Sequence, residues 1–94
     1  MENMKKNIHV EVSGKVQGVW FRANTKEKAE QLNINGWVKN TADGKVEAVF
    51  EGEEENIKEM LDWCHQGPPL AKVQTVDVEE KNSLEGLEGF SIKY

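Results

Sequence analysis

The stretch VSGKVQGVWFR (residues 12–22) joins an alternating strand to a glycine-flanked loop and then to a predicted helix. Gly14 and Gly18 flank the loop, and glycine adopts backbone angles that other residues avoid. The amides between the two glycines can therefore turn inward and converge on one point. A phosphate fits such a concavity, so the stretch predicts an anion site at the end of a strand.

The predicted helix begins without a capping side chain, because no Ser, Thr, Asp or Asn precedes its first turn. Trp20 and Phe21 stand there instead, so the first backbone amides remain free to donate. The positive end of the helix dipole and the planar fork of Arg22 add to the attraction for a doubly charged group. A loop whose amides bind only water, with Arg22 on the surface, explains these residues as well and stays open.

Hydrophobic periodicity divides the rest of the chain into strands and helices. The predicted elements are a strand over 8–13, a helix over about 22–34, strands over 37–40 and 46–51 joined by the Asp43-Gly44 hairpin, a helix from 53 up to Gly67, a strand over 73–78 and a short strand over 90–94. The spacing slips between Val73 and Val76, which predicts a β-bulge in the strand over 73–78.

This β-α-β-β-α-β order predicts an α+β fold, a ferredoxin-like sandwich with two helices on one face of an antiparallel sheet and a short C-terminal edge strand. The first helix carries the chain back, so the strands on either side of it end at the same edge of the sheet. The 14–19 loop and Asn40 should therefore meet. A neutral amide there suits a water molecule, although these residues alone favour a turn role for Asn40 in the 40–44 hairpin.

Length and composition limit the classes of function. Ninety-four residues predict a single domain over 1–94, and the 37% of hydrophobic and 31% of charged residues are typical of a soluble globular protein. The net charge of −5 disfavours a nucleic-acid or anionic-membrane partner, because both require a basic patch. The N-terminal MENMKKN has no apolar run behind its lysines, so we expect neither signal peptide nor membrane anchor. We expect a cytoplasmic protein and a monomer.

Other reactive side chains offer weaker candidate sites. His9 and His65 have no second ligand at metal-binding spacing, so we interpret them as an exposed strand residue and a cation at a helix C-terminus. Cys64 is the only cysteine, which points to a reducing compartment. It falls on the apolar stripe of the second predicted helix and is expected in the core rather than as a nucleophile.

Two segments of the chain resemble the signatures of a known family. VSGKVQGVWFR is similar to the first signature of the acylphosphatases, and GWVKNTADGKVEAVFEG (residues 36–52) is similar to the second. The resemblance implies a ferredoxin-like hydrolase that cleaves carboxylic–phosphoric mixed anhydrides to a carboxylate and phosphate, without metal or cofactor. It implies that Arg22 binds the phosphate and that Asn40 orients the attacking water. It assigns the phosphate cradle to the backbone amides of Lys15, Val16, Gln17, Gly18 and Val19.

The chemistry of that reaction suits a site with so few side chains. A carboxylate whose conjugate acid has a pKa of about 4 leaves without help from a general acid. Phosphoryl transfer depends largely on positioning and on charge stabilisation, so amides and one arginine can supply most of the catalysis. Asn40 cannot remove a proton, so we expect the substrate phosphate to accept it. The expected partners are a small acyl phosphate and inorganic phosphate, which is both product and inhibitor.

Two other classes of function remain as alternatives. A non-catalytic module that binds phosphate or an acyl phosphate needs only the loop and Arg22, and turnover distinguishes it from an enzyme. A ferredoxin-like RNA-binding domain needs aromatic residues along its central strands and a basic sheet. The third predicted strand offers only Phe50 and the chain is acidic, so these residues disfavour RNA.

Overall fold

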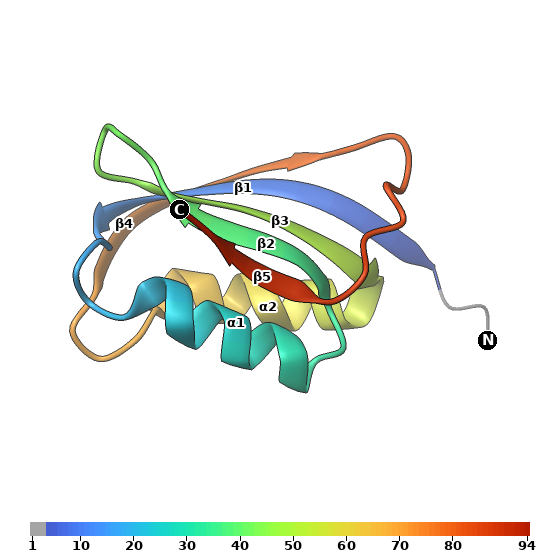
Figure 1. Ribbon diagram of the computed structural model, residues 1–94, viewed down its shortest axis with the longest axis horizontal. Coiled ribbons are helices and arrows are strands. Elements are labelled where there is room, and N and C mark those ends of the chain that lie inside the picture. Colours follow the sequence, from blue (N-terminus) through green and yellow to red (C-terminus); the bar gives the residue numbers. More distant parts are fainter. Residues whose placement is uncertain (1–3) are drawn as a thin grey trace.

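The computed structural model describes residues 4–94 and contains the predicted elements in the predicted order. In chain order they are β1 (Lys5–Lys15), α1 (Phe21–Gln31), β2 (Asn35–Asn40), β3 (Val46–Glu53), α2 (Glu54–Gln66), β4 (Lys72–Glu80) and β5 (Phe90–Lys93), as Figure 1 shows. No helix within residues 4–94 is both long and apolar enough to cross a membrane. The expectation about signal peptide and anchor falls partly on residues 1–3, which lie outside the described residues.

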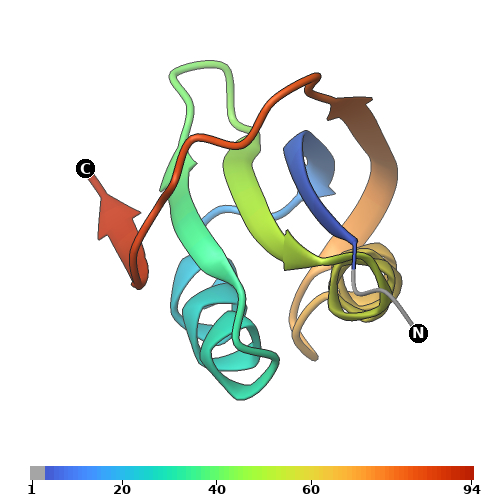
Figure 2. The same ribbon diagram turned by 90° about the vertical axis from the view of Figure 1, so that its right-hand side faces the viewer.

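The strands form one five-stranded sheet in the order β4-β1-β3-β2-β5. The first four strands pair antiparallel to their neighbours, whereas β5 pairs parallel to β2 at the sheet edge. The ferredoxin-like prediction and its short edge strand are confirmed, and the sheet is mixed rather than wholly antiparallel. The reason is visible in Figures 1 and 2: segment 81–89 crosses from β4 over one end of the sheet and enters β5 in the direction of β2.

Both helices cover the same face of the sheet, and the core lies between the two layers (Figure 2). α1 buries Phe21, Thr25 and Ala29 at helical spacing, and α2 buries Ile57, Met60 and Cys64. Alternate residues of the central strands complete the core; they include Ile8, Val10, Val12, Val46, Ala48 and Phe50. The predicted core position of Cys64 is confirmed.

The N-terminal boundary of α1 agrees with the prediction to within one residue, but the helix ends three residues earlier than predicted. Asn33 adopts a left-handed conformation with a φ of 55°, which stops the helix. The amide N–H of Ile34 still donates to the carbonyl oxygen of Ala29 at 2.9 Å and closes the helix end. The side chain of Ile34 then enters the core as β2 begins.

The predicted bulge lies where β1 gives way to the loop. Ser13 pairs with Thr75 and Gly14 pairs with Val73, so Gln74 is the extra residue. Gly14 has a φ of 122°, and a Cβ atom there would lie 2.2 Å from the carbonyl oxygen of Lys72. Glycine is therefore required at this position by close contact with β4 as well as by backbone angle.

Candidate active site

A cavity of about 280 Å³ opens at the end of the sheet where β1 and β2 both terminate. Its walls come from the loop after β1, the first turn of α1, the end of β2 and the segment around β5, namely Val16, Gly18, Trp20, Phe21, Arg22, Ala23, Asn40, Ile92 and Tyr94. The predicted meeting of the loop and Asn40 is confirmed. β1 and β2 lie on either side of β3 and run in the same direction, so the loop after β1 and Asn40 at the end of β2 lie at the same edge of the sheet.

The first turn of α1 carries no side-chain cap, as the sequence predicted. Trp20 occupies the N-cap position in a left-handed conformation, with a φ of 68°. Its carbonyl oxygen accepts hydrogen bonds from the backbone N–H and the side-chain Nδ2 of Asn24, at 3.0 and 2.8 Å. These bonds fix the turn while leaving the first-turn N–H groups without a side-chain partner, and such a helix terminus attracts anions.

Arg22 is half-buried at the wall of the cavity, one residue after the start of α1. Its guanidinium carbon lies 5.3 Å from the centre of the Tyr94 ring, within the range of a cation–π contact. Within residues 4–94 no carboxylate forms an ion pair with Arg22. The positive charge is therefore available to an anionic ligand.

Asn40 ends β2, and its side-chain Oδ1 is buried without a hydrogen-bond partner among the described residues. The hydrogen bonds of the 40–44 turn among residues 4–94 do not include this side chain. Thr41 closes the hairpin instead: its backbone N–H donates to the Lys45 carbonyl at 2.9 Å, and its Oγ1 accepts the Lys45 N–H at 3.0 Å. An orphaned buried acceptor that lines a cavity is a suitable partner for a water molecule or ligand.

The loop is attached to the β2–β3 hairpin through Gln17. Its Nε2 donates to the carbonyl oxygens of Thr41 and Lys45 at 2.9 and 2.8 Å. Val16 and Val19 are buried in the core, so their side chains anchor the loop to the interior of the protein. Gly18 has a φ of 73°, which a residue with a side chain rarely adopts. The loop is thus held on both sides, as a preorganised cradle requires.

The structure brings only part of the predicted site to the cavity wall. Val16, Gly18, Arg22 and Asn40 line it. Lys15, Gln17 and Val19 do not line it, but they are immediate chain neighbours of Val16 and Gly18 in the same loop. Sequence reasoning missed Tyr94 and Ile92 as lining residues, because no local motif links them to the loop. It also missed the hydrogen bonds of Gln17 and Thr41 that hold the loop and the hairpin. The only indication in the sequence is that both residues lie within the two segments that resemble family signatures.

The other candidate groups lie outside the cavity. Burial raises the pKa of the Cys64 thiol to about 12. His9 Nε2 lies 2.5 Å from Glu47 Oε2, and this contact holds the pKa of Glu47 below its ordinary value. His65 Nδ1 lies 2.9 Å from the carbonyl oxygen of Leu61 in the last turn of α2. Residues 4–94 contain no cluster of three or more metal-ligating side chains.

The fold and this cavity define a class: a small ferredoxin-like protein with a glycine loop and an uncapped helix start at one end of its sheet. The same end holds an arginine that has no carboxylate partner within the described range 4–94. The sequence pattern of the acylphosphatase family matches residues 8–92. An acylphosphatase of Rubrobacter xylanophilus is 52% identical over 94% of this chain and 80% of its own, and one of Trichormus variabilis is 55% identical over 92% and 84%. The acylphosphatase structure from Bacillus subtilis aligns with a TM-score of 0.92 at 40% identity, covering 97% of this chain and 100% of its own.

The chain belongs to the acylphosphatase family. It is an enzyme that hydrolyses acyl phosphates.

Proposed function

We propose that the enzyme cleaves the carboxyl–phosphate bond by direct attack of a water molecule on the phosphorus. In this mechanism the backbone amides of Lys15, Val16, Gln17, Gly18 and Val19 hold the phosphate together with Arg22, and Asn40 orients the water. The observation that supports it most is the buried, unpartnered Oδ1 of Asn40 in the same cavity as Arg22. One cavity then offers a cation for the phosphate and an acceptor for the water.

The phosphate end of the substrate binds where fixed donors converge. Arg22 has no carboxylate partner within residues 4–94 and can form two parallel charge-assisted hydrogen bonds to phosphate oxygens. The loop amides and the start of α1 add neutral donors and the helix dipole. Because these groups are already in position, they stabilise the charge that develops on the equatorial oxygens without reorganising.

The water end needs a hydrogen-bond acceptor and no base. Asn40 Oδ1 accepts one hydrogen bond from the water. This bond orients the water so that a lone pair of the water oxygen points at phosphorus. As the new P–O bond forms, the bond to the acyl oxygen breaks, and its electron pair leaves with the carboxylate. The proton of the attacking water passes to a phosphate oxygen. The carboxylate is a weak base, so no general acid is required.

The test compares turnover with phosphate binding in Asn40→Ala, using a chelator in every assay. We expect phosphate affinity, measured by calorimetry, to stay within about twofold, while turnover of an aryl-acyl phosphate falls about 100-fold or more. The reason is that Asn40 contacts the water and not the phosphate. Asn40→Asp should also lose turnover, because it places a negative charge beside the phosphate.

Asn56→Ala, which removes an amide from α2 outside this cavity, is the matched control and should keep full turnover. A parallel loss of affinity and turnover in Asn40→Ala would make Asn40 a phosphate ligand. Phosphate binding without any turnover in the wild type would favour the non-catalytic module.

A further inference from the structure

The cavity is larger than a phosphate group needs. Its 280 Å³ approaches the range of about 300–1,000 Å³ typical of small-molecule sites, whereas a phosphate group consists only of phosphorus and four oxygens. The floor is deeply buried, because Val16 and Phe21 are 1% and 2% exposed. The rim is open, because Trp20 is 72% exposed and Tyr94 is fully exposed. A phosphate held near Arg22 therefore leaves the rim for the rest of the substrate.

Trp20 stands at this rim although tryptophan ordinarily prefers a negative φ and a largely buried side chain. A bulky residue with a φ of 68° is a conformational outlier, and its indole is mostly in water rather than in the core. Strained backbone positions of this kind cluster at binding and active sites. Neither packing nor backbone preference explains a tryptophan here, but contact with a ligand does.

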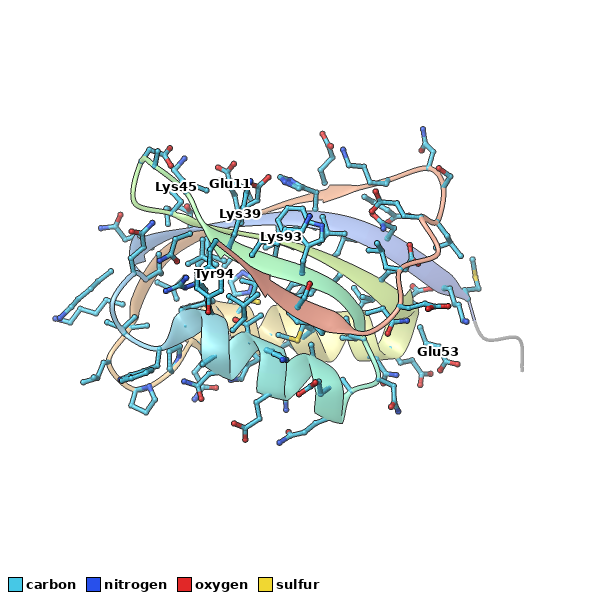
Figure 3. All side chains as sticks on the ribbon, viewed as in Figure 1. Glu11, Lys39, Lys45, Glu53, Lys93 and Tyr94 are labelled. Atoms are coloured by element: carbon cyan, nitrogen blue, oxygen red, sulfur yellow. The ribbon has the colours of Figure 1, made fainter. Side chains whose placement is uncertain are left out.

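β5 supplies the other apolar surfaces of the cavity. Ile92 lies on β5 and Tyr94 follows it, and both line the cavity that contains Arg22. Figure 3 shows the Tyr94 side chain beside the start of α1, where its ring lies 5.3 Å from the Arg22 guanidinium carbon. The rim therefore carries two exposed aromatic rings and an aliphatic side chain next to the cation that holds the phosphate.

We propose that Trp20, with Ile92 and Tyr94, forms the subsite for the acyl group and selects aromatic or other bulky apolar acyl phosphates over acetyl phosphate. This proposal rests on the proposed function, because it takes the phosphate end to lie at Arg22. An aromatic acyl group reaches the rim and stacks on an indole face, while an acetyl group is too small to do so. Trp20 is thus a specificity residue and takes no part in the bond-breaking step.

The first test compares benzoyl phosphate with acetyl phosphate in the wild type, Trp20→Gly and Trp20→Phe. Glycine adopts a positive φ freely, so Trp20→Gly removes the ring without adding strain, and it adds no side-chain acceptor that could cap the first amides of α1. We expect its kcat/KM for benzoyl phosphate to fall about 5- to 10-fold, the size of one aromatic stack, and its kcat/KM for acetyl phosphate to stay within about twofold. Trp20→Phe should keep most of the preference.

Leu84→Gly is the control, because it removes another exposed apolar side chain, 49% exposed, that lies outside this cavity. We expect it to leave both substrates unaffected. Comparing each variant with the wild type by the ratio of the two kcat/KM values cancels the different intrinsic reactivity of the two substrates.

The second test needs no turnover. Benzoylphosphonate and acetylphosphonate are stable analogues, and their dissociation constants should differ in the wild type but approach each other in Trp20→Gly. An equal fall in kcat/KM for benzoyl and acetyl phosphate would overturn the acyl subsite while leaving hydrolysis intact. So would an unchanged ratio of the two kcat/KM values together with an unchanged ratio of the two phosphonate dissociation constants. Absence of turnover on both substrates would instead refute the proposed function, and the phosphonate ratio would still decide the role of Trp20.

Discussion

Burial decides what Cys64 can do. The side chain lies on the core face of α2 with only 1% of its surface exposed. Because burial raises the pKa of its thiol to about 12, the nucleophilic thiolate is almost absent at neutral pH. A buried thiol of this kind behaves as a small apolar side chain. Cys64 therefore contributes to stability and not to chemistry.

Substitution of Cys64 by Ser should lower stability without lowering turnover. A hydroxyl buried without a partner costs about 1–3 kcal/mol, and each kcal/mol lowers the Tm of a domain of this size by about 4–8 °C. Calorimetry and steady-state rates at a temperature where the variant is folded check both expectations. Cys64→Ala separates the cost of lost volume from that of the hydroxyl. Loss of turnover in a folded Cys64→Ser protein would show that the thiol takes part in the reaction.

Single residues show how far the sequence predicts the site. The pattern around Arg22 predicted an uncapped helix start, and the N-cap position of Trp20 confirms it. For Asn40 the residues alone favoured a turn role, because asparagine is common in turns. The turn bonds belong to Thr41, and only the backbone geometry of the hairpin distinguishes these two neighbours. The positive φ of Trp20 could not be predicted, because tryptophan rarely adopts it.

Whole helices and strands were predictable where the spacing of apolar residues along a short stretch of sequence shows their period. The stripe of Ile57, Met60 and Cys64 predicts α2, and the slipped valine spacing predicts the bulge opposite Gly14. The parallel pairing of β5 was not predictable, because long-range contacts determine it. Segment 81–89 has no periodicity of its own, and its place depends on a carboxylate from β3.

That carboxylate belongs to Glu51, which is buried with 5% of its surface exposed. Its Oε2 accepts the backbone N–H of Glu85 at 2.6 Å and the Nδ2 of Asn7 at 2.9 Å. Its Oε1 accepts the backbone N–H of Leu87 at 2.9 Å. Glu51 thereby holds the crossing segment that leads into β5 and so to the Tyr94 side of the cavity.

The stability that Glu51 supplies should depend on pH in a defined direction. Burial alone raises the pKa of its carboxyl, but the hydrogen bonds from Asn7 and the backbone amides of Glu85, Leu87 and Gly86 outweigh burial and hold the pKa below its ordinary value. A depressed folded-state pKa gives stability that is present above the unfolded value of about 4.3 and is lost as pH falls through the folded-state pKa. Glu51→Gln should therefore be less stable than the wild type at pH 7, by about 1–3 kcal/mol.

Urea unfolding of both proteins between pH 7 and pH 3 measures this difference, which should shrink at the acid end. Glu55→Gln, in the exposed first turn of α2, is the matched control and should show little difference at any pH. A difference for Glu51→Gln that stays constant from pH 7 to pH 3 would contradict the role of the ionised carboxylate.

At the scale of the whole molecule, the site lies at one end of a body of 38 × 22 × 20 Å, where three distant parts of the chain converge (Figure 1). The loop after β1, the end of β2 and the segment around β5 all contribute to it. A ligand bound there connects parts that unfolding separates. The net charge of −5 opposes an anionic ligand at long range, so affinity must come from the fixed local donors.

Inorganic phosphate should therefore stabilise the folded protein through Arg22. A ligand that binds only the folded state at ten times its dissociation constant adds about 1.4 kcal/mol, which raises the Tm by about 6–11 °C in a domain of this size. Arg22→Ala should lose most of this shift, because it removes the charge-assisted bonds to the phosphate oxygens. Arg22→Lys should recover only part of it, because an ammonium lacks the planar fork.

The measurement is thermal unfolding against phosphate concentration, with sodium chloride keeping the ionic strength constant. Phosphate also stabilises folded proteins by exclusion from their surface, and this general effect is the same in every variant. The difference between wild type and Arg22→Ala therefore isolates binding at the site. Asn40→Ala should keep the full shift, because its side chain contacts the water and not the phosphate in the proposed mechanism. Equal shifts in wild type and Arg22→Ala would place the phosphate elsewhere and refute the assignment of Arg22.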